Sequence, residues 1–275
     1  MNILLTGAQG NFGTAFCRQA QNMPGLSITP IGRHDWDSMD EKLDAASVVV
    51  HAASDLRTPA SASPTQLLNS NLMSTAALLE ASRVHSIKKF VFLSSCAVYG
   101  EDMTTAETSL CRPISINGIS KHLNEKLIAE FCTANGIDFQ ILRVFNSYGG
   151  RDNFSILSKL KRSLLAGTPF TLNNDGRMLR DFIHIEDVAA IVLKLATTDV
   201  SQTHLNVGTG VATKIASLVA MVKTQFPKLV IKPGVSLEAE YSRADTTHLR
   251  QVWANDFKRI EDYVSSQFKA YVEAR

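Results

Sequence analysis

Thr6-Gly7-Ala8-Gln9-Gly10-Asn11-Phe12-Gly13 is the stretch of sequence that decides the fold. It follows the apolar run Ile3-Leu4-Leu5 and opens a segment with helical spacing, which is the context a GxxGxxG loop requires. Its first glycine permits a tight turn, the second lets the backbone approach a pyrophosphate, and the third allows close helix packing. The free N–H groups at the helix N-terminus then face the anion. We therefore expect a dinucleotide here, bound by Gly7, Gly10, Asn11, Phe12 and Gly13.

Outward from this loop, short apolar runs alternate with helix-like segments. The runs lie at 3–5, 28–31, 48–50, 90–93 and 139–142, and the helix-like segments include 76–84 and 122–131. Short, wholly apolar strands separated by crossover helices are typical of parallel sheets that are buried on both faces. We predict an α/β fold, a Rossmann-type doubly wound parallel sheet with a small C-terminal substrate lobe.

The rhythm breaks near Gly149, after which the sequence indicates one helix at about 154–166 and a turn at Asn173-Asn174-Asp175-Gly176. We place the dinucleotide-binding domain at residues 1–148. Residues 149–275 are expected to form mainly the substrate-binding lobe, with some segments returning to the sheet.

Composition excludes several other classes of protein. The 275 residues are 45% hydrophobic and carry a formal net charge of +2 without a basic cluster, so we expect no nucleic-acid partner. No apolar run approaches the ~18 residues that a membrane span needs, and the N-terminus lacks a basic leader, so we expect a cytoplasmic protein. The four cysteines form no CxxC pair, so reduced thiols and no metal site are expected.

The end of the second predicted strand bears on the choice of cofactor. It reads Ile31-Gly32-Arg33-His34, without the carboxylate that usually accepts the ribose 2′-hydroxyl of NAD. Arg33 is suited to pair with a 2′-phosphate, which favours NADP over NAD. The alternative is that Arg33 is a solvated loop residue.

Several further motifs extend along nearly the whole chain. They are His51-Ala52-Ala53, Asn71 with Leu78-Leu79-Glu80-Ala81, Ser94-Ser95-Cys96-Ala97-Val98-Tyr99-Gly100, Arg143-Val144-Phe145-Asn146-Ser147-Tyr148-Gly149, Arg180 to Ala189, and Leu205-Asn206-Val207-Gly208-Thr209-Gly210. In combination with the glycine loop, this set resembles the extended short-chain dehydrogenase/reductases, the NAD-dependent epimerase/dehydratase family of sugar-nucleotide enzymes.

The resemblance implies a nucleotide-sugar substrate between the two lobes and a set of site residues. Ser95 and Lys121 would be catalytic, and Ala52, Ala53, Asn71 and Lys121 would contact the cofactor. Ser95, Asn146, Arg180 and Arg243 would contact the substrate, with Asn146 and Arg180 facing its diphosphate and Arg243 contributing as well. The family also implies a homodimer. The short passage containing Asp35-Trp36-Asp37 is similar to the dTDP-4-dehydrorhamnose reductase branch, in which Asp35 and Trp36 would lie beside the adenine.

The chain departs from the family at one catalytic position. The family places a tyrosine four residues before the lysine, on the same helix face, so that the phenol exchanges a proton with the substrate oxygen. Lys121 is in register, but the tyrosine position holds Asn117. An amide forms hydrogen bonds and does not titrate near neutral pH, so Asn117 can orient a sugar oxygen without transferring its proton.

Three interpretations follow. In the first, which we favour, the protein is an NAD(P)-dependent 4-ketoreductase, or alternatively an epimerase or dehydratase, with Lys121, Ser95 or a water molecule as the proton relay. In the second it is a catalytically silent NAD(P)-binding sensor or partner protein. In the third, Asn117 was introduced deliberately, or Ser115 or Tyr99 replaces the tyrosine.

Overall fold

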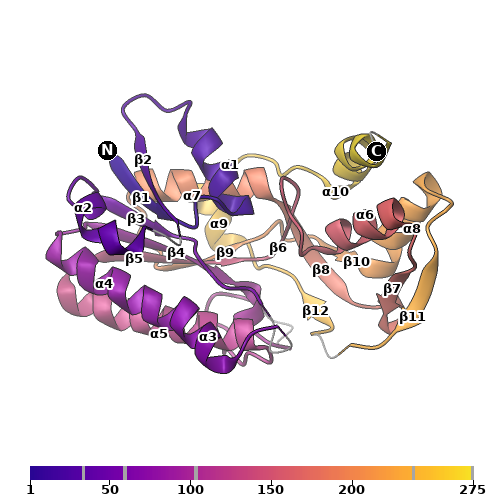
Figure 1. Cartoon of the computed structure of the whole chain (residues 1–275), viewed down its shortest axis with the longest axis horizontal. Helices are drawn as coiled ribbons and strands as arrows, with labels where there is room; N and C mark the ends of the chain where they lie inside the picture. The colour runs from indigo at the N-terminus through magenta and orange to yellow at the C-terminus, as the bar shows by residue number, and fades with distance from the viewer. Residues whose placement is uncertain (33–34, 58–60, 102–104, 237–238, 274–275) are drawn as a thin grey trace.

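The computed structural model describes residues 1–32, 35–57, 61–101, 105–236 and 239–273. Figure 1 shows two parts, an N-terminal part built around a layered sheet and a C-terminal part that carries α6, α8, β7 and β11. Strands β6 and β8 run between them. Each part has its own cluster of buried apolar side chains.

The described residues of the N-terminal part form a six-stranded sheet in the order β2-β1-β3-β4-β5-β9, and every neighbouring pair is parallel. Its strands are β1 (Asn2–Thr6), β2 (Ser27–Ile31), β3 (Val48–His51), β4 (Lys89–Ser95), β5 (Asp138–Val144) and β9 (His204–Val207). The first five contain the five apolar runs found in the sequence. The predicted α/β, Rossmann-type parallel sheet is therefore confirmed.

Helices cover both faces of this sheet. Helices α1 (Asn11–Ala20), α7 (Ile185–Thr197) and α9 (Thr247–Val252) share one apolar cluster with one face. The opposite face packs against α2 (Met39–Leu43), α4 (Ser74–Val84) and α5 (Ile116–Asn135). Between β3 and α4 the chain forms α3 (Pro64–Leu68) and a π-helical segment, η2 (Asn69–Met73).

The C-terminal part is built around β8 (Leu179–His184). This strand pairs with β10 (Ala212–Lys214), β12 (Tyr241–Ser242) and β6 (Asn146–Tyr148), while β7 (Phe170–Asn173) pairs with β11 (Ile231–Gly234). The helices are α6 (Ile156–Ala166), α8 (Ile215–Gln225), α10 (Ile260–Tyr263) and α11 (Lys269–Glu273). The expected boundary between residues 148 and 149 stays a prediction.

Helix ends follow local capping chemistry. Helix α5 begins at Ile116 and so includes Asn117 and Lys121, as the sequence indicated; the Ser115 hydroxyl caps it by accepting a hydrogen bond from Gly118 N–H. It ends at Gly136, whose φ of 64° is readily adopted by glycine. Ser155 and Gly167 bound α6 in the same manner. In the described part of the chain, no helix combines the length and apolarity needed to span a bilayer.

Candidate active site

A cavity of about 1550 Å³ lies between the two parts of the molecule. Its walls include the glycine loop, the end of β2, the segment that follows β3, the loop after β6, α6, β7 and part of β8. A site for one small ligand occupies roughly 300–1,000 Å³. The cavity is therefore large enough to hold two ligands side by side.

The glycine loop forms one end of this cavity. Gly7 has φ of 72°, and a Cβ there would lie 2.8 Å from Ala53 N, while a side chain at Gly13 would collide with the Gly7 carbonyl oxygen. Thr6 Oγ1 accepts hydrogen bonds from the N–H groups of Ala52 and Ala53, which fixes the loop against the end of β3. The glycines thus let the loop pack closely and bring the backbone at the start of α1 to the cavity, where a helix N-terminus is suited to an anion.

Asn71 supports the cavity wall from behind. Its Oδ1 accepts a hydrogen bond from Asp55 N–H at 2.6 Å, and its Nδ2 donates to the Asp55 carbonyl at 3.1 Å. The side chain is buried and does not belong to the cavity lining, whereas Ser54, Asp55 and Arg57 do. The Asp55 carboxylate pairs with Arg57 at 2.6 Å, and this contact raises the pKa of the guanidinium.

The expected catalytic residues lie at the ends of β4 and α5. Lys121 is buried, donates a hydrogen bond to the Leu93 carbonyl at 2.6 Å, and lies 4.5 Å from the centre of the Phe92 ring. Burial lowers the pKa of Lys121 to about 8, although the Glu125 carboxylate opposes the shift. The Ser95 hydroxyl accepts a hydrogen bond from Ala97 N–H at 3.2 Å.

Asn117 lies one helical turn before Lys121, as the sequence indicated. Its Nδ2 donates to the Leu56 carbonyl, with the two atoms 3.5 Å apart. Leu56 lines the cavity, but Ser95, Asn117 and Lys121 do not appear among the described lining residues. The Asn117 side-chain amide therefore contacts the cavity wall at Leu56.

Ser115 and Tyr99, the two possible replacements for the tyrosine, both form hydrogen bonds elsewhere in the structure. The Tyr99 ring is buried; its hydroxyl donates to Asn206 Oδ1 at 2.6 Å and accepts from Arg143 at 3.0 Å. Burial also raises the pKa of Tyr99. The Ser115 hydroxyl is engaged as the cap of α5.

Two of the four expected substrate residues line the cavity, and both come from strands of the C-terminal part. Asn146 lines it and donates hydrogen bonds to the Asp181 carbonyl at 2.8 Å and to Ser242 Oγ at 3.3 Å. Arg180 also lines it, with its guanidinium bonded to the Leu179 carbonyl at 3.0 Å. Arg243 is exposed and is not among the described residues of the lining.

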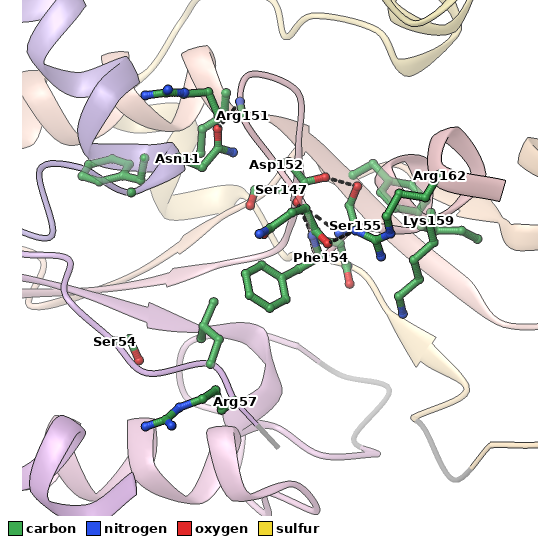
Figure 2. A pocket seen from close by; sticks show the side chains of 18 of the residues that line it. Asn11, Ser54, Arg57, Ser147, Arg151, Asp152, Phe154, Ser155, Lys159 and Arg162 are labelled. Carbon is green, nitrogen blue, oxygen red and sulfur yellow. Dashed lines mark hydrogen bonds between the residues drawn. The ribbon is translucent and has the colours of Figure 1, made fainter. Parts of the chain in front are cut away.

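Sequence reasoning missed a group of cationic residues in this wall. Arg151, Lys159 and Arg162 all line the cavity, and Figure 2 shows Lys159 and Arg162 extending from α6. Lys159 and Arg162 are three residues apart, which places them on one helix face. The spacing was visible in the sequence, but the side of α6 that faces the cavity was not.

Three residues expected near the adenosine, Arg33, Asp35 and Trp36, follow β2 in the sequence. Arg33 lies outside the described residues. Asp35 Oδ2 accepts a hydrogen bond from Gly32 N–H at 2.7 Å, and its Oδ1 lies 2.8 Å from the Lys42 ammonium. Gly32 and Trp36 line the cavity. The Asp35 carboxylate thus folds back onto the end of β2, although no carboxylate stands at the expected position in the sequence.

One other group of side chains brings possible metal ligands together. Cys111, His122 and Glu125 place their donor atoms within 4.8 Å of one another. However, Glu125 already accepts three hydrogen bonds from the Arg143 guanidinium, at 2.8, 3.1 and 3.3 Å, and a further one from the Ser94 hydroxyl. A carboxylate neutralised in this way is a poor ligand for a cation.

Comparison with known proteins identifies relatives over most of the chain. A model of the NAD dependent epimerase/dehydratase family matches residues 3–208. A Bacillus subtilis (strain 168) protein, named as an uncharacterized UDP-glucose epimerase, is 33% identical over 156 residues, which cover 56% of this chain and 49% of the relative. A candidate UDP-glucose 4-epimerase of Methanocaldococcus jannaschii is 31% identical over 233 residues, covering 81% of this chain and 73% of the relative.

Solved structures extend the likeness to the full length. MoeE5, in complex with UDP-glucuronic acid and NAD, is 25% identical with a TM-score of 0.89, and the alignment covers 100% of both chains. A UDP-N-acetylglucosamine 4-epimerase from Methanobrevibacter ruminantium M1, in complex with UDP-N-acetylmuramic acid, is 25% identical with a TM-score of 0.84. That alignment covers 99% of this chain and 97% of the epimerase.

Proposed function

This chain belongs to the NAD-dependent epimerase/dehydratase family, and on that premise we propose that it is an NAD-dependent epimerase of nucleotide-activated sugars. The observation that carries the proposal is the cavity, which has an open helix N-terminus at one end and Arg180, Lys159 and Arg162 at the other. Each end is suited to a diphosphate, the first through backbone N–H groups and the second through cationic side chains. A dinucleotide and a nucleotide sugar together supply two such groups.

We infer NAD rather than NADP as the cofactor. The sequence expectation of NADP rested on Arg33, whereas the described end of β2 presents the Asp35 carboxylate, bonded to Gly32. A carboxylate at this point accepts hydrogen bonds from a ribose and repels a 2′-phosphate. Calorimetric titration should give a lower Kd for NAD than for NADP. Tighter binding of NADP would contradict the inference and indicate that Arg33 determines the choice of cofactor.

The chemistry divides between cofactor and protein. A bound NAD would supply reversible hydride transfer to and from a sugar carbon. In this proposal Ser95, at the end of β4, hydrogen-bonds the reacting oxygen, and Asn117 orients that oxygen without taking its proton. Because Lys121 is the titratable member of this trio, we assign the proton transfer to it, with the Ser95 hydroxyl as the relay.

Two other functions use the same cavity. The 4-ketoreductase first expected from the sequence would consume one reduced cofactor for each product, whereas an epimerase consumes none. A silent nucleotide-sugar-binding protein is favoured by one observation, the amide of Asn117 at the tyrosine position. The relatives with epimerase names support the epimerase over both.

The deciding experiment compares the wild type with Asn117→Tyr and, as a matched control, Asn117→Phe. Each is incubated with NAD and UDP-glucose, UDP-glucuronic acid or UDP-N-acetylglucosamine, and the epimer and reduced cofactor are quantified. We expect slow epimerisation by the wild type and an increase of about 10²- to 10⁴-fold in Asn117→Tyr alone, the usual contribution of a positioned proton donor. Binding without turnover in the wild type, with activity only in Asn117→Tyr, would identify a silent binder instead.

A further inference from the structure

The side chain of Asn11 crosses from the cofactor loop to the other part of the molecule. Asn11 is the first residue of α1. Its Nδ2 donates a hydrogen bond to the Gly149 carbonyl at 3.1 Å, and its Oδ1 accepts one from Arg151 N–H at 2.6 Å. Both bonds join residues more than 130 positions apart in the sequence, and Figure 2 shows Asn11 and Arg151 next to each other.

The turn that Asn11 holds is shaped for this contact. Gly149 and Gly150 have φ values of 90° and 63°. A Cβ at Gly150 would lie 2.6 Å from Asn11 Oδ1, and a Cβ at Gly149 would lie 2.5 Å from His184 Nε2. Glycine is therefore required at both positions, for backbone conformation and for space. The turn is clamped between Asn11 on one side and His184 on the other.

From this turn a continuous series of bonds leads to α6. Asp152 Oδ1 accepts hydrogen bonds from the N–H groups of Phe154 at 2.8 Å and Ser155 at 3.0 Å. Ser155 in turn caps α6 by accepting from Ser158 N–H. Arg162 closes the series by donating from its Nη1 to the Asn153 carbonyl at 2.6 Å. The cationic face of α6 is thus placed by the turn that Asn11 holds.

We propose that Asn11 is a positioning residue that couples the two ligand sites: its backbone belongs to the cofactor's anion site, and its side chain places the turn and the cationic face of α6 that bind the nucleotide sugar. This inference rests on the proposed function, because that function identifies the second ligand as a nucleotide sugar. Coupling between two sites is reciprocal, so the cofactor strengthens binding of the nucleotide diphosphate and the diphosphate strengthens binding of the cofactor.

Hydrogen–deuterium exchange tests the coupling without a second ligand. In the wild type, saturating NAD should slow exchange of the amides in residues 151–156 by at least about threefold. Asn11→Ala should lose this NAD-dependent slowing. Gly150→Ala should lose it independently, because the added methyl group displaces the Asn11 side-chain amide while the sequence of α1 is unchanged. Thr14→Ala is the matched control, because the Thr14 hydroxyl bonds only to the Gly10 carbonyl within the same turn of α1. It should keep the wild-type response.

Titration with UDP, with and without saturating NAD, measures the energetic consequence. We expect NAD to lower the Kd of UDP about three- to tenfold in the wild type and in Thr14→Ala, as two hydrogen bonds of ordinary strength allow. The ratio should approach one in Asn11→Ala. If the wild type binds no UDP, the proposed function is wrong. The exchange experiment alone then shows whether Asn11 couples the cofactor site to the turn at 149–151. NAD-dependent slowing that is absent from the wild type, or equal in Asn11→Ala, would overturn the inference.

Discussion

Lys121 sits in the protein interior with its ammonium on the Leu93 carbonyl and over the Phe92 ring. Its pKa falls from the ordinary 10.5 to about 8, mainly through desolvation. Between those two values the unfolded chain binds more protons at this position than the folded chain does. The free energy of unfolding therefore rises with pH across that window, by on the order of 3 kcal/mol.

The measurement is urea unfolding at pH 7.5 and pH 10, for the wild type and for Lys121→Met. The apolar variant should be more stable than the wild type at pH 7.5, and the difference should shrink at pH 10, where the wild-type amine is largely neutral. An equal gain in stability on raising the pH in both proteins would show that other groups cause it.

A second residue-scale prediction concerns Glu125, which holds the buried guanidinium of Arg143. The two side chains are 2% and 6% exposed, so neither charge is solvated. Glu125→Ala leaves Arg143 without its counter-charge and should reduce the free energy of unfolding by about 3–5 kcal/mol. The surface pair of Arg177 and Glu240 offers a control, because both side chains are about two-thirds exposed. Glu240→Ala should change stability little, and a similar loss in both variants would contradict the prediction.

Among the elements, α6 presents two of the cations that the proposed function needs. Lys159→Met should raise the KM for the nucleotide sugar about tenfold, because one charge-assisted contact to phosphate is worth at least about 1.4 kcal/mol. The Kd of NAD should not change, since the cofactor's anion site is on α1. Lys161→Met removes the same charge from the same helix, outside the described lining of the large cavity. Equal effects of both substitutions on KM would point to net charge rather than to contact.

Elements formed by local patterns were predictable from the sequence, and those formed by distant partners were not. The glycine loop and β1 to β5 follow from turn chemistry and apolar runs. Strand β9 contains only the short run Leu205-Asn206-Val207, and it becomes a strand because Leu205 pairs beside Leu142 on β5. The orientation of α6 depends on packing against β7, so Lys159 and Arg162 could not be assigned to the cavity in advance.

The same limit applied to individual site residues. The sequence placed Lys121 and Asn117 one helical turn apart, and the structure has them so, because helix periodicity is local. The cofactor contact expected of Asn71 stays a prediction, and the sequence did not reveal that its amide bonds to the backbone of Asp55. Asn11 was also expected at the cofactor, and the sequence did not reveal that its side chain bonds to the turn at 149–151. Both contacts depend on how remote segments meet, which spacing does not reveal.

At the scale of the whole molecule, one flank of the N-terminal part carries exposed apolar side chains. Figure 1 shows α3, α4 and α5 grouped along this flank. Leu68, Met73, Ile119 and Leu123 are each more than 40% exposed, and Ile119 and Leu123 are one turn apart on α5. The segments that carry them are bonded together, as Asn124 Nδ2 donates to the Asn71 carbonyl. A patch of this kind is typical of a protein interface.

We expect a second copy of the chain to cover that patch, because a self-complementary contact around a two-fold axis is the commonest way to bury such a surface. Sedimentation equilibrium should find a dimer for the wild type and a monomer with unchanged circular dichroism for Leu123→Glu, which places charges across the axis. Val235→Glu is the control, since this side chain is 89% exposed in the C-terminal part and should leave the dimer intact. A monomeric wild type would refute the dimer, whereas dissociation of both variants would place the contact elsewhere. Because Leu123 lies on α5, the helix that carries Lys121, the Leu123→Glu monomer should also bind NAD more weakly if the partner copy holds α5 in place.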